Sequence, residues 1–356
     1  MKNKLYILCF ACILGIFSVG TIAGFGRTYS ELENRYLESA PDFSVRNYFK
    51  GKVTAQVDAF VPDRLFGKDA LIYTKTALDR LSGKRLLNEV YYRDGRYLEN
   101  YKADWDEIEA SVALYGQWAR ACEDVPFFLL PVPVNSNIYQ DQLPKSNECQ
   151  DQNKVFAWIR ENLDESVAYV DVVPALNGHK NEDIYFLTDH HWTMRGAGYA
   201  WQVFAEQSGG GVKEPDRFER TVLSEDFYGT LFSKAPVHKT PKDKVEVFQD
   251  PAVSYEVEIP EERRTVDSFL RMDRLKLKDK YAVFFGGNYG LATIRNKTGG
   301  EGKLLVIKDS YANVFVPFLI KDYKEIQMVD ERYFKQNMAD YIKAEGFDRV
   351  LILRKF

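Results

Sequence analysis

Residues 304–311 read Leu-Leu-Val-Ile-Lys-Asp-Ser-Tyr, an apolar run that ends abruptly in a serine. A short continuous apolar run is typical of a buried parallel strand. The pattern that follows, at 314–321, is helix-like. Ser310 is therefore predicted to lie in a tight turn between a strand and a helix. In an α/β sheet such a turn lies at the carboxyl edge, where ligands bind.

The segments around this strand show the same alternation of short apolar strands and helices. Thr193 is a suitable N-cap for one of the helices. The order of elements predicts an α/β fold with a doubly wound parallel sheet. The expected strands are 125–132, 167–172, 304–307, 325–329 and 350–353, and the expected helices are 104–121, 152–163, 194–206, 314–321 and 334–345.

Residues 208–300 interrupt this alternation. Three glycines at 209–211 open the segment, and the runs 245–248 and 255–259 alternate like exposed antiparallel strands. We interpret the segment as a β-rich insertion that lies over the ligand site expected at the carboxyl edge of the sheet.

The N-terminus is the clearest signal in the composition. Lys2 and Lys4 precede an uncharged run, 5–26, of about 22 residues, which is long enough to span the hydrocarbon core of a bilayer. Cleavage after Ala23 would make the run a secretory signal, but its length favours an uncleaved anchor. In either case the rest of the chain is expected to be exported.

Three regions follow from these patterns. Residues 1–26 are a transmembrane anchor or signal peptide. Residues 27–120 are expected to form a stalk and a helical leader that pack on the core, with two helical pieces split at Pro62 and a hairpin at 90–98. Residues 121–356 are expected to form the catalytic domain.

The bulk composition is that of an ordinary globular protein. The chain has 356 residues, of which 45% are hydrophobic and 28% charged, and its net charge is −4. No basic stripe favours nucleic acid as a partner. Outside the apolar run, Cys122 and Cys149 are compatible with a disulfide and equally with two free thiols.

Residues 187–193 read Leu-Thr-Asp-His-His-Trp-Thr and hold half of the four histidines of the chain. In an extended segment, side chains two residues apart share a face. Asp189 is therefore placed to accept a hydrogen bond from His191, whose other ring nitrogen would face a substrate. His190 is expected to point the other way as a structural histidine, and Trp192 to pack beneath the loop or line the pocket.

A serine nucleophile requires a base within hydrogen-bond reach and a third group that orients the base. We expect Ser310, His191 and Asp189 to meet in space as such a site. Free N–H groups at the helix start would hold an oxyanion, at about 3 kcal/mol per donor. Asp309 is expected to brace the turn.

The rival interpretation is a metal site, because Asp-His-His is dense in ligand atoms. Adjacent side chains diverge on a strand, and the sequence has no HExxH or paired-cysteine motif. Only His179 and His238 remain as further imidazoles. We therefore expect neither a metal nor a cofactor.

The sequences TDHHW (188–192) and KDSYAN (308–313), with an ENRYL stalk (33–37), closely resemble the DHHW protein family. That family is similar to the periplasmic alginate O-acetylation proteins, which carry an SGNH-hydrolase-like domain. The resemblance covers essentially the whole chain. In those relatives an Asp-x-His pair precedes the serine, a permuted order relative to ordinary SGNH hydrolases, and Asp189, His191 and Ser310 match it.

The resemblance implies transfer or removal of O-acetyl groups on an extracytoplasmic polysaccharide. It also implies a membrane-bound O-acyltransferase as the supplier of acetyl groups. The alternatives are a polysaccharide O-acetylesterase that uses the same residues and a non-catalytic glycan-binding or assembly protein that keeps the fold.

One departure concerns the oxyanion site. Lys308 stands where SGNH hydrolases place the glycine of Gly-Asp-Ser, so the resemblance does not identify the donors of the oxyanion site. The turn at 286–290 is either a source of donors or an ordinary β-turn. The expected substrate or oxyanion neighbours are Tyr311, Asn313, Asn288, Arg295, Trp192 and His190.

Overall fold

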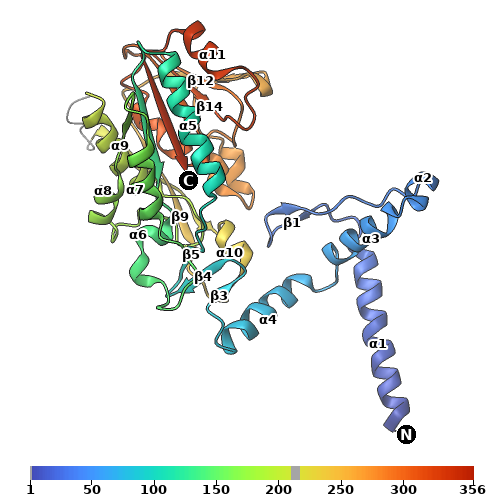
Figure 1. Ribbon diagram of the computed structural model, residues 1–356. Coiled ribbons are helices and arrows are strands. Elements are labelled where there is room, and N and C mark those ends of the chain that lie inside the picture. The colour runs from blue at the N-terminus through green and yellow to red at the C-terminus, as the bar shows by residue number, and fades with distance from the viewer. Residues whose placement is uncertain (1, 210–216) are drawn as a thin grey trace. The chain divides into compact units, whose positions relative to one another are not determined.

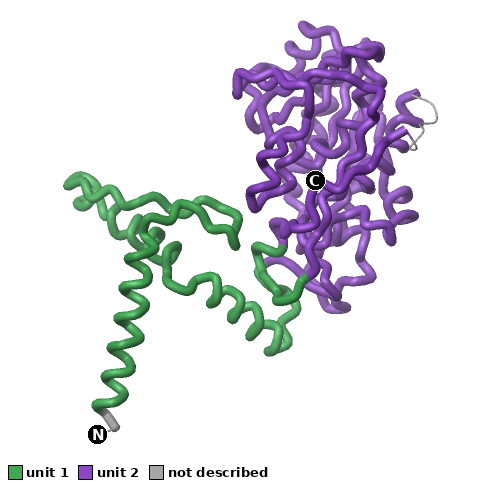
Figure 2. Tube along the Cα trace, turned by 180° about the vertical axis from the view of Figure 1, so that it is seen from behind, with its two compact units in different colours: residues 1–88, 232–240 green, residues 89–231, 241–356 purple. Residues whose placement is uncertain are grey.

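The computed structural model describes residues 2–209 and 217–356. The chain divides into two compact units, Met1–Asn88 with Phe232–Thr240 and Glu89–Leu231 with Pro241–Phe356, which are coloured separately in Figure 2. The second unit contains the large sheet visible in Figure 1 and both segments expected to carry the site.

The second unit is built on an eight-stranded sheet with the strand order β11–β10–β12–β14–β13–β15–β6–β7. The five strands from β14 to β7 are parallel. Each overlaps a strand predicted from the sequence, so the α/β core is confirmed. The bounds are β6 Phe127–Val132, β7 Val167–Tyr169, β13 Lys303–Lys308, β14 Glu325–Val329 and β15 Arg349–Lys355.

The sheet is mixed, so the predicted parallel sheet accounts for only part of it. β10 (Tyr255–Ile259), β11 (Arg264–Val266) and β12 (Ala292–Asn296) extend it beyond β14, and β12 pairs antiparallel with β14. These strands come from the segment expected to form a β-rich insertion, and they join the central sheet instead of lying over the site. The edge of β14 presents backbone N–H and C=O groups that need partners, and β12 supplies them.

Helices cover both faces of the sheet. On one face, α5 (Trp105–Ala121), α7 (Gln152–Asn162) and α11 (Met338–Glu345) share a buried apolar cluster with β13 and β15. On the other, Phe204 of α9 (Met194–Gln207) contacts Phe128 of β6 at 5.5 Å between ring centroids. Thr193 caps α9 through Gly196 N, as predicted.

The segment after Ser310 differs from the expected α-helix over 314–321. It forms two 3₁₀ helices, η6 (Ser310–Val314) and η7 (Val316–Leu319). Pro317 lies within the second and has no N–H for an α-helical hydrogen bond. The short helices keep the chain close to the end of β13.

Part of the expected insertion forms a separate ribbon. β8 (Glu219–Phe227) and β9 (Asp243–Gln249) pair antiparallel as a two-stranded sheet. Gly210 and Gly211, two of the three glycines expected to open this segment, lie outside the described residues.

The remaining elements of the second unit are short. The predicted hairpin is confirmed by β4 (Val90–Arg93) and β5 (Arg96–Glu99), with positive φ at Asp94 and Gly95, which suits the twist of a tight hairpin turn. The others are α6 Asn135–Ile138, η1 Gln140–Gln142, α8 Val173–Gly178, η3 Pro260–Glu262, η4 Met272–Lys276 and η5 Lys280–Val283. α10 (Thr230–Lys234) begins in the second unit, and its residues from Phe232 on belong to the first.

The first unit begins with α1 (Lys2–Ala23), in which Lys4–Ala23 is long and apolar enough to cross a membrane. The last turn of α1 is tied to its own unit, since Thr21 Oγ1 accepts from Phe66 N at 3.1 Å. The predicted division near Pro62 is confirmed, because α3 ends at Asp63 and α4 begins at Lys68. The bounds are α2 Val45–Phe49, α3 Lys52–Asp63, α4 Lys68–Leu81, β1 Tyr29–Ser30, β2 Arg35–Tyr36 and β3 Leu86–Leu87.

Cys122 and Cys149, for which the sequence left both a disulfide and free thiols open, are free thiols in the structure. Cys122 is buried in the apolar cluster, and burial raises the pKa of its thiol. The Cys149 Sγ lies 3.5 Å from Ser136 Oγ.

Candidate active site

Ser310 stands at the carboxyl end of β13 as the first residue of η6. The turn is held by Asp309, whose carboxylate accepts from Tyr311 N at 2.9 Å and from Lys355 N at 2.8 Å. One aspartate therefore caps η6 and joins it to β15. Asp309 has the bracing place expected from the sequence.

The segment 187–193 lies between α8 and α9 and is irregular apart from one bridge between Tyr185 and Trp192. Trp192 is fully buried, and its Nε1 donates to Tyr311 O at 2.9 Å. In the other direction, Tyr311 Oη donates to His190 O at 2.8 Å. These two reciprocal bonds hold the histidine segment against the serine turn.

A chain of hydrogen bonds joins the two segments. His191 Nε2 lies 2.7 Å from Ser310 Oγ, and His191 Nδ1 lies 2.6 Å from Asp189 Oδ1. The same carboxylate oxygen also accepts from His191 N at 3.0 Å. A hydroxyl, an imidazole and a carboxylate are therefore within direct reach of one another, which is the arrangement that a serine nucleophile requires.

The second oxygen of Asp189 is bound from a distant part of the chain. Thr230 donates to Oδ2 from its N at 2.7 Å and from its Oγ1 at 3.0 Å. Burial raises the pKa of Asp189, but the fields of His190 and His191 and these hydrogen bonds outweigh it and hold the pKa well below its usual range. Asp189 is therefore ionised.

The prediction that His190 points away from the site, which assumed an extended chain, is wrong. Its Nδ1 lies 2.8 Å from Thr230 Oγ1 and 3.4 Å from Asp189 Oδ1, and its ring lies 3.8 Å from that of His191. The chain bends here, so neighbouring side chains converge. Burial, with the charge of His191, lowers the pKa of His190 to about 4, so its ring is neutral at neutral pH.

This convergence also removes the geometric reason for expecting no metal. Ligand atoms of Asp189, His190 and His191 lie within 4.8 Å of one another. In this arrangement, however, the same atoms are hydrogen-bonded to Ser310, to Thr230 and to each other. These atoms therefore form a hydrogen-bonded network in this arrangement, rather than an open set of metal ligands.

Gly229 allows the close approach of Thr230 to Asp189. A Cβ at Gly229 would lie 2.3 Å from Asp189 Cβ and 2.7 Å from its Cα. Such contacts are too short for any side chain, and one of the two atoms belongs to the backbone. Glycine is therefore required at 229 by the packing of this loop.

Tyr281 covers the ring of His191. Its ring stacks on His191 with 3.8 Å between centroids and 7° between planes. Its hydroxyl donates to Ser310 O at 2.8 Å. The tyrosine thus fixes the imidazole plane and the serine backbone together.

Asp243, the first residue of β9, anchors the start of the histidine segment. Its buried carboxylate accepts from Leu187 N at 2.6 Å, from Thr188 N at 2.8 Å and from Thr188 Oγ1 at 2.5 Å. Burial raises its pKa to about 6 despite these bonds. No sequence signal pointed to Asp243, Gly229, Thr230 or Tyr281, because each acts through a contact distant in the chain.

The other expected neighbours divide into two groups. Tyr311, Trp192 and His190 contact the site, as described. Asn288 and Asn313 turn their Oδ1 atoms to Lys308 Nζ, at 2.7 and 2.8 Å. The prediction that Arg295 neighbours the site is wrong. Arg295 pairs with Glu258 and Glu325 at the amino end of β14, which is the edge of the sheet opposite Ser310.

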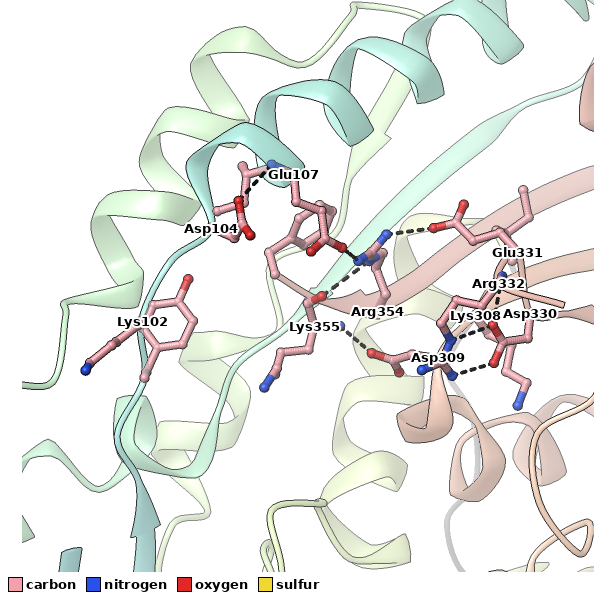
Figure 3. Close-up of a pocket in the computed structure, with 14 residues that line it drawn as sticks. Lys102, Asp104, Glu107, Lys308, Asp309, Asp330, Glu331, Arg332, Arg354 and Lys355 are labelled. Carbon is pink, nitrogen blue, oxygen red and sulfur yellow. Dashed lines mark hydrogen bonds and ion pairs between the residues drawn. The ribbon is translucent and has the colours of Figure 1, made fainter. Parts of the chain in front are cut away.

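A pocket of about 330 Å³ lies beside the serine turn, at the carboxyl ends of β13, β14 and β15 (Figure 3). Its charged side chains are largely paired, as in Arg332–Asp330 at 2.6 Å and Arg354–Glu331 at 2.7 Å. The α5 face supplies Glu107 and Ile108. Lys308 and Asp309 line it, whereas Ser310 does not.

Comparison with known proteins finds one matching family and several solved structures of similar fold. The profile of a family described as DHHW protein matches residues 97–329. A DHHW family protein from Eubacterium siraeum is 27% identical with a TM-score of 0.65, covering 75% of this chain and 91% of the other. PatB1 from Bacillus cereus, solved with a sulfonyl adduct, is 19% identical with a TM-score of 0.63, covering 75% and 94%, which shows the fold alone.

A more distant likeness, to the O-acetyltransferase domain of AlgJ from Pseudomonas putida, has 15% identity and a TM-score of 0.46, covering 75% of this chain and 90% of the other. No curated protein sequence matches this chain.

Proposed function

The chain belongs to the DHHW protein family, and on that basis we propose that it is an acyl-transfer enzyme: an O-acetyltransferase that modifies an extracytoplasmic polysaccharide through an acyl-Ser310 intermediate. The observation that carries the proposal is the hydrogen-bonded chain from Ser310 Oγ through His191 to Asp189. The choice of acetyl as the transferred group and of a polysaccharide as the acceptor rests on the resemblance to the alginate O-acetylation proteins.

In the first half-reaction, His191 Nε2 takes the proton of Ser310 as Oγ attacks the acetyl carbonyl of the donor. The bond between the acetyl carbon and the donor oxygen breaks, and His191 returns the proton to that oxygen. Asp189 keeps the imidazole in the correct tautomer and stabilises its protonated form. The product is an acetyl ester of Ser310.

In the second half-reaction, a glycan hydroxyl attacks the acetyl ester of Ser310. His191 now takes the hydroxyl proton and transfers it to Ser310 Oγ as the ester bond breaks. Water in place of the glycan would give an acetylesterase. The Ser310 N–H is the first of η6 and has no acceptor within that helix, which makes it a donor for the acyl oxygen.

For the location, we propose that α1 is a retained membrane anchor with the second unit outside the membrane. Its length and composition support this, as does the bond between Thr21 and the backbone of Phe66 in the same unit. A membrane-bound O-acyltransferase would then supply acetyl groups near the anchor.

The test uses the full chain in detergent with a chromogenic acetyl ester, with and without an added oligosaccharide. We expect Ser310→Ala to abolish turnover and acetyl to appear on the oligosaccharide. Arg295→Ala is the control, since Arg295 lies at the far edge of the sheet. Acetate released into water alone would favour the esterase, and equal turnover by wild type and Ser310→Ala would exclude catalysis by this serine.

A chemical probe adds a second readout. An arylsulfonyl fluoride loses fluoride to an activated serine, and mass spectrometry of a digest locates the adduct. We expect labelling at Ser310, lost in His191→Ala. Absence of the label from Ser310 in the wild type would favour a non-catalytic glycan-binding protein.

A further inference from the structure

Lys308 places a buried ammonium two residues before the nucleophile. Its side chain is 5% exposed, and its Nζ donates to Asn288 Oδ1 and Asn313 Oδ1. An ammonium can only donate, so both amide atoms that face it must be oxygens. Lys308 therefore decides the orientation of both amides and turns their NH₂ groups away from itself.

The two amides lie next to the nucleophile segment. Asn313 belongs to η6, which begins at Ser310, and its Nδ2 lies 3.5 Å from Gly287 O. Asn288 is part of the same turn, where Gly286 and Gly287 adopt positive φ. Within residues 2–209 and 217–356, Asn288 Nδ2 has no acceptor.

We propose that Lys308 is a positioning residue of this site, whose ammonium orients Asn288 so that Nδ2 donates to the acyl oxygen on Ser310. The inference rests on the proposed function. A neutral amine accepts as well as donates, so loss of the proton frees both amides to turn over. The donor set is then no longer fixed before the reaction.

The charged groups around Lys308 do not replace the amides. Asp309 follows Lys308 directly at the end of β13, and Asp330 and Arg332 follow the end of β14 (Figure 3). Both oxygens of Asp330 are engaged by Arg332, at 2.8 and 2.6 Å. Burial lowers the pKa of Lys308 to about 8, although the charges of Asp330 and Asp309 oppose this.

This environment makes activity and stability respond to pH in opposite directions. Between about pH 8 and 10.5 the folded chain binds fewer protons at Lys308 than the unfolded chain. The contribution of Lys308 to stability therefore rises with pH over this window. Activity falls over the same window, because the ammonium is lost.

The experiment measures kcat and KM of the full chain in detergent on an acetyl ester between about pH 6 and 10. We expect Lys308→Met to lower kcat roughly 100- to 1,000-fold with little change in KM, and to abolish the alkaline decline. Asn288→Ala should give a similar loss that does not add to the first. Lys303→Met, at the other end of β13, is the matched control.

Retention of both kcat and the alkaline decline in Lys308→Met would overturn the inference. Melting temperatures over the same pH range provide the independent readout, and the wild type should gain stability relative to Lys308→Met as pH rises. If wild type and Ser310→Ala turn over equally, the proposed function fails, yet this difference still reports the buried ammonium. If Lys308→Met does not fold, an alkaline decline of the wild type without loss of melting temperature supports the inference, and a parallel loss of both contradicts it.

Discussion

The serine is carried by the end of a strand, whereas the histidine and aspartate are carried by a loop with little secondary structure of its own. β13 is hydrogen-bonded to β14 on one side and to β15 on the other. The strand is therefore held along its length, and its carboxyl end has a fixed position. The loop 187–193 has one isolated bridge and depends on side chains from elsewhere. Its anchors are Asp243 and Thr230.

This difference predicts where each half is vulnerable. The position of Ser310 follows from the parallel ladder and from Asp309, which are local to the sheet. The position of His191 follows from buried polar contacts, and removing one partner of such a contact leaves the other unsatisfied. Substitutions at the anchors of the loop should therefore impair catalysis without touching the nucleophile.

Among substitutions that leave Ser310 in place, the largest effect is expected from the aspartate of the loop. Asp189→Asn should lower kcat about 10,000-fold, because an amide cannot hold the required tautomer of His191. Turnover of the acetyl ester measures the loss, with Asp171→Asn at a half-exposed ion pair as the control. A loss below about tenfold would show that His191 is oriented by other groups.

The next effect is steric. Gly229→Ala should lower kcat by about 100-fold and the melting temperature by several degrees, because its Cβ would meet the Asp189 side chain and backbone. Gly178→Ala is the matched control, since its Cβ would meet nothing within 4 Å. Equal melting temperatures for the two variants would contradict the assigned packing.

A smaller effect is expected at Asp243, which binds the first residues of the loop. Asp243→Asn should lower kcat roughly tenfold, because the amide keeps one acceptor oxygen and replaces the other with an NH₂ donor. One of the two backbone N–H groups, of Leu187 or Thr188, then loses its acceptor. Unchanged kcat would indicate that the contacts of Thr230, Tyr311 and Tyr281 position the loop without Asp243.

The same variant provides a pH test. The folded-state pKa of Asp243, about 6, lies above its ordinary value of 3.8, so the folded chain binds the extra proton between these values. Melting temperatures should show that the wild type gains stability relative to Asp243→Asn as pH falls from about 6 to 4. A difference that does not vary with pH would show that Asp243 is not the titrating group.

The smallest effect is expected at the far edge of the sheet. Arg295→Ala should leave kcat and KM unchanged and reduce stability by less than about 1 kcal/mol, because its ion pairs are partly exposed. Steady-state kinetics and a urea titration measure both quantities. A tenfold change in kcat would mean that the substrate extends across the sheet.

Much of the second unit could be predicted because its elements are encoded locally. The apolar runs of β6, β13, β14 and β15 were visible as buried strands, as were the cap Thr193 and the Asp94-Gly95 turn. The side on which β10 joins the sheet could not be predicted. Alternation reports which face of a strand is buried but not which neighbour pairs with it.

The histidine segment shows the same limit within a few residues. An extended chain separates His190 from Asp189, and this reasoning failed because the segment bends around Thr230. The pair Asp189 and His191 was nevertheless identified, since their side chains lie close in both conformations.

The sequence by itself determined the strands of the parallel core, most of its helices, the membrane-compatible helix and the residue types of the site, because these depend on local periodicity and on functional groups. Only the tertiary structure decided that Gly229, Thr230 and Asp243 hold the loop and that Lys308 binds two amides. Those contacts join residues 5 to more than 50 positions apart. They exist because buried polar groups must find partners, and the partners become available only when the chain has folded.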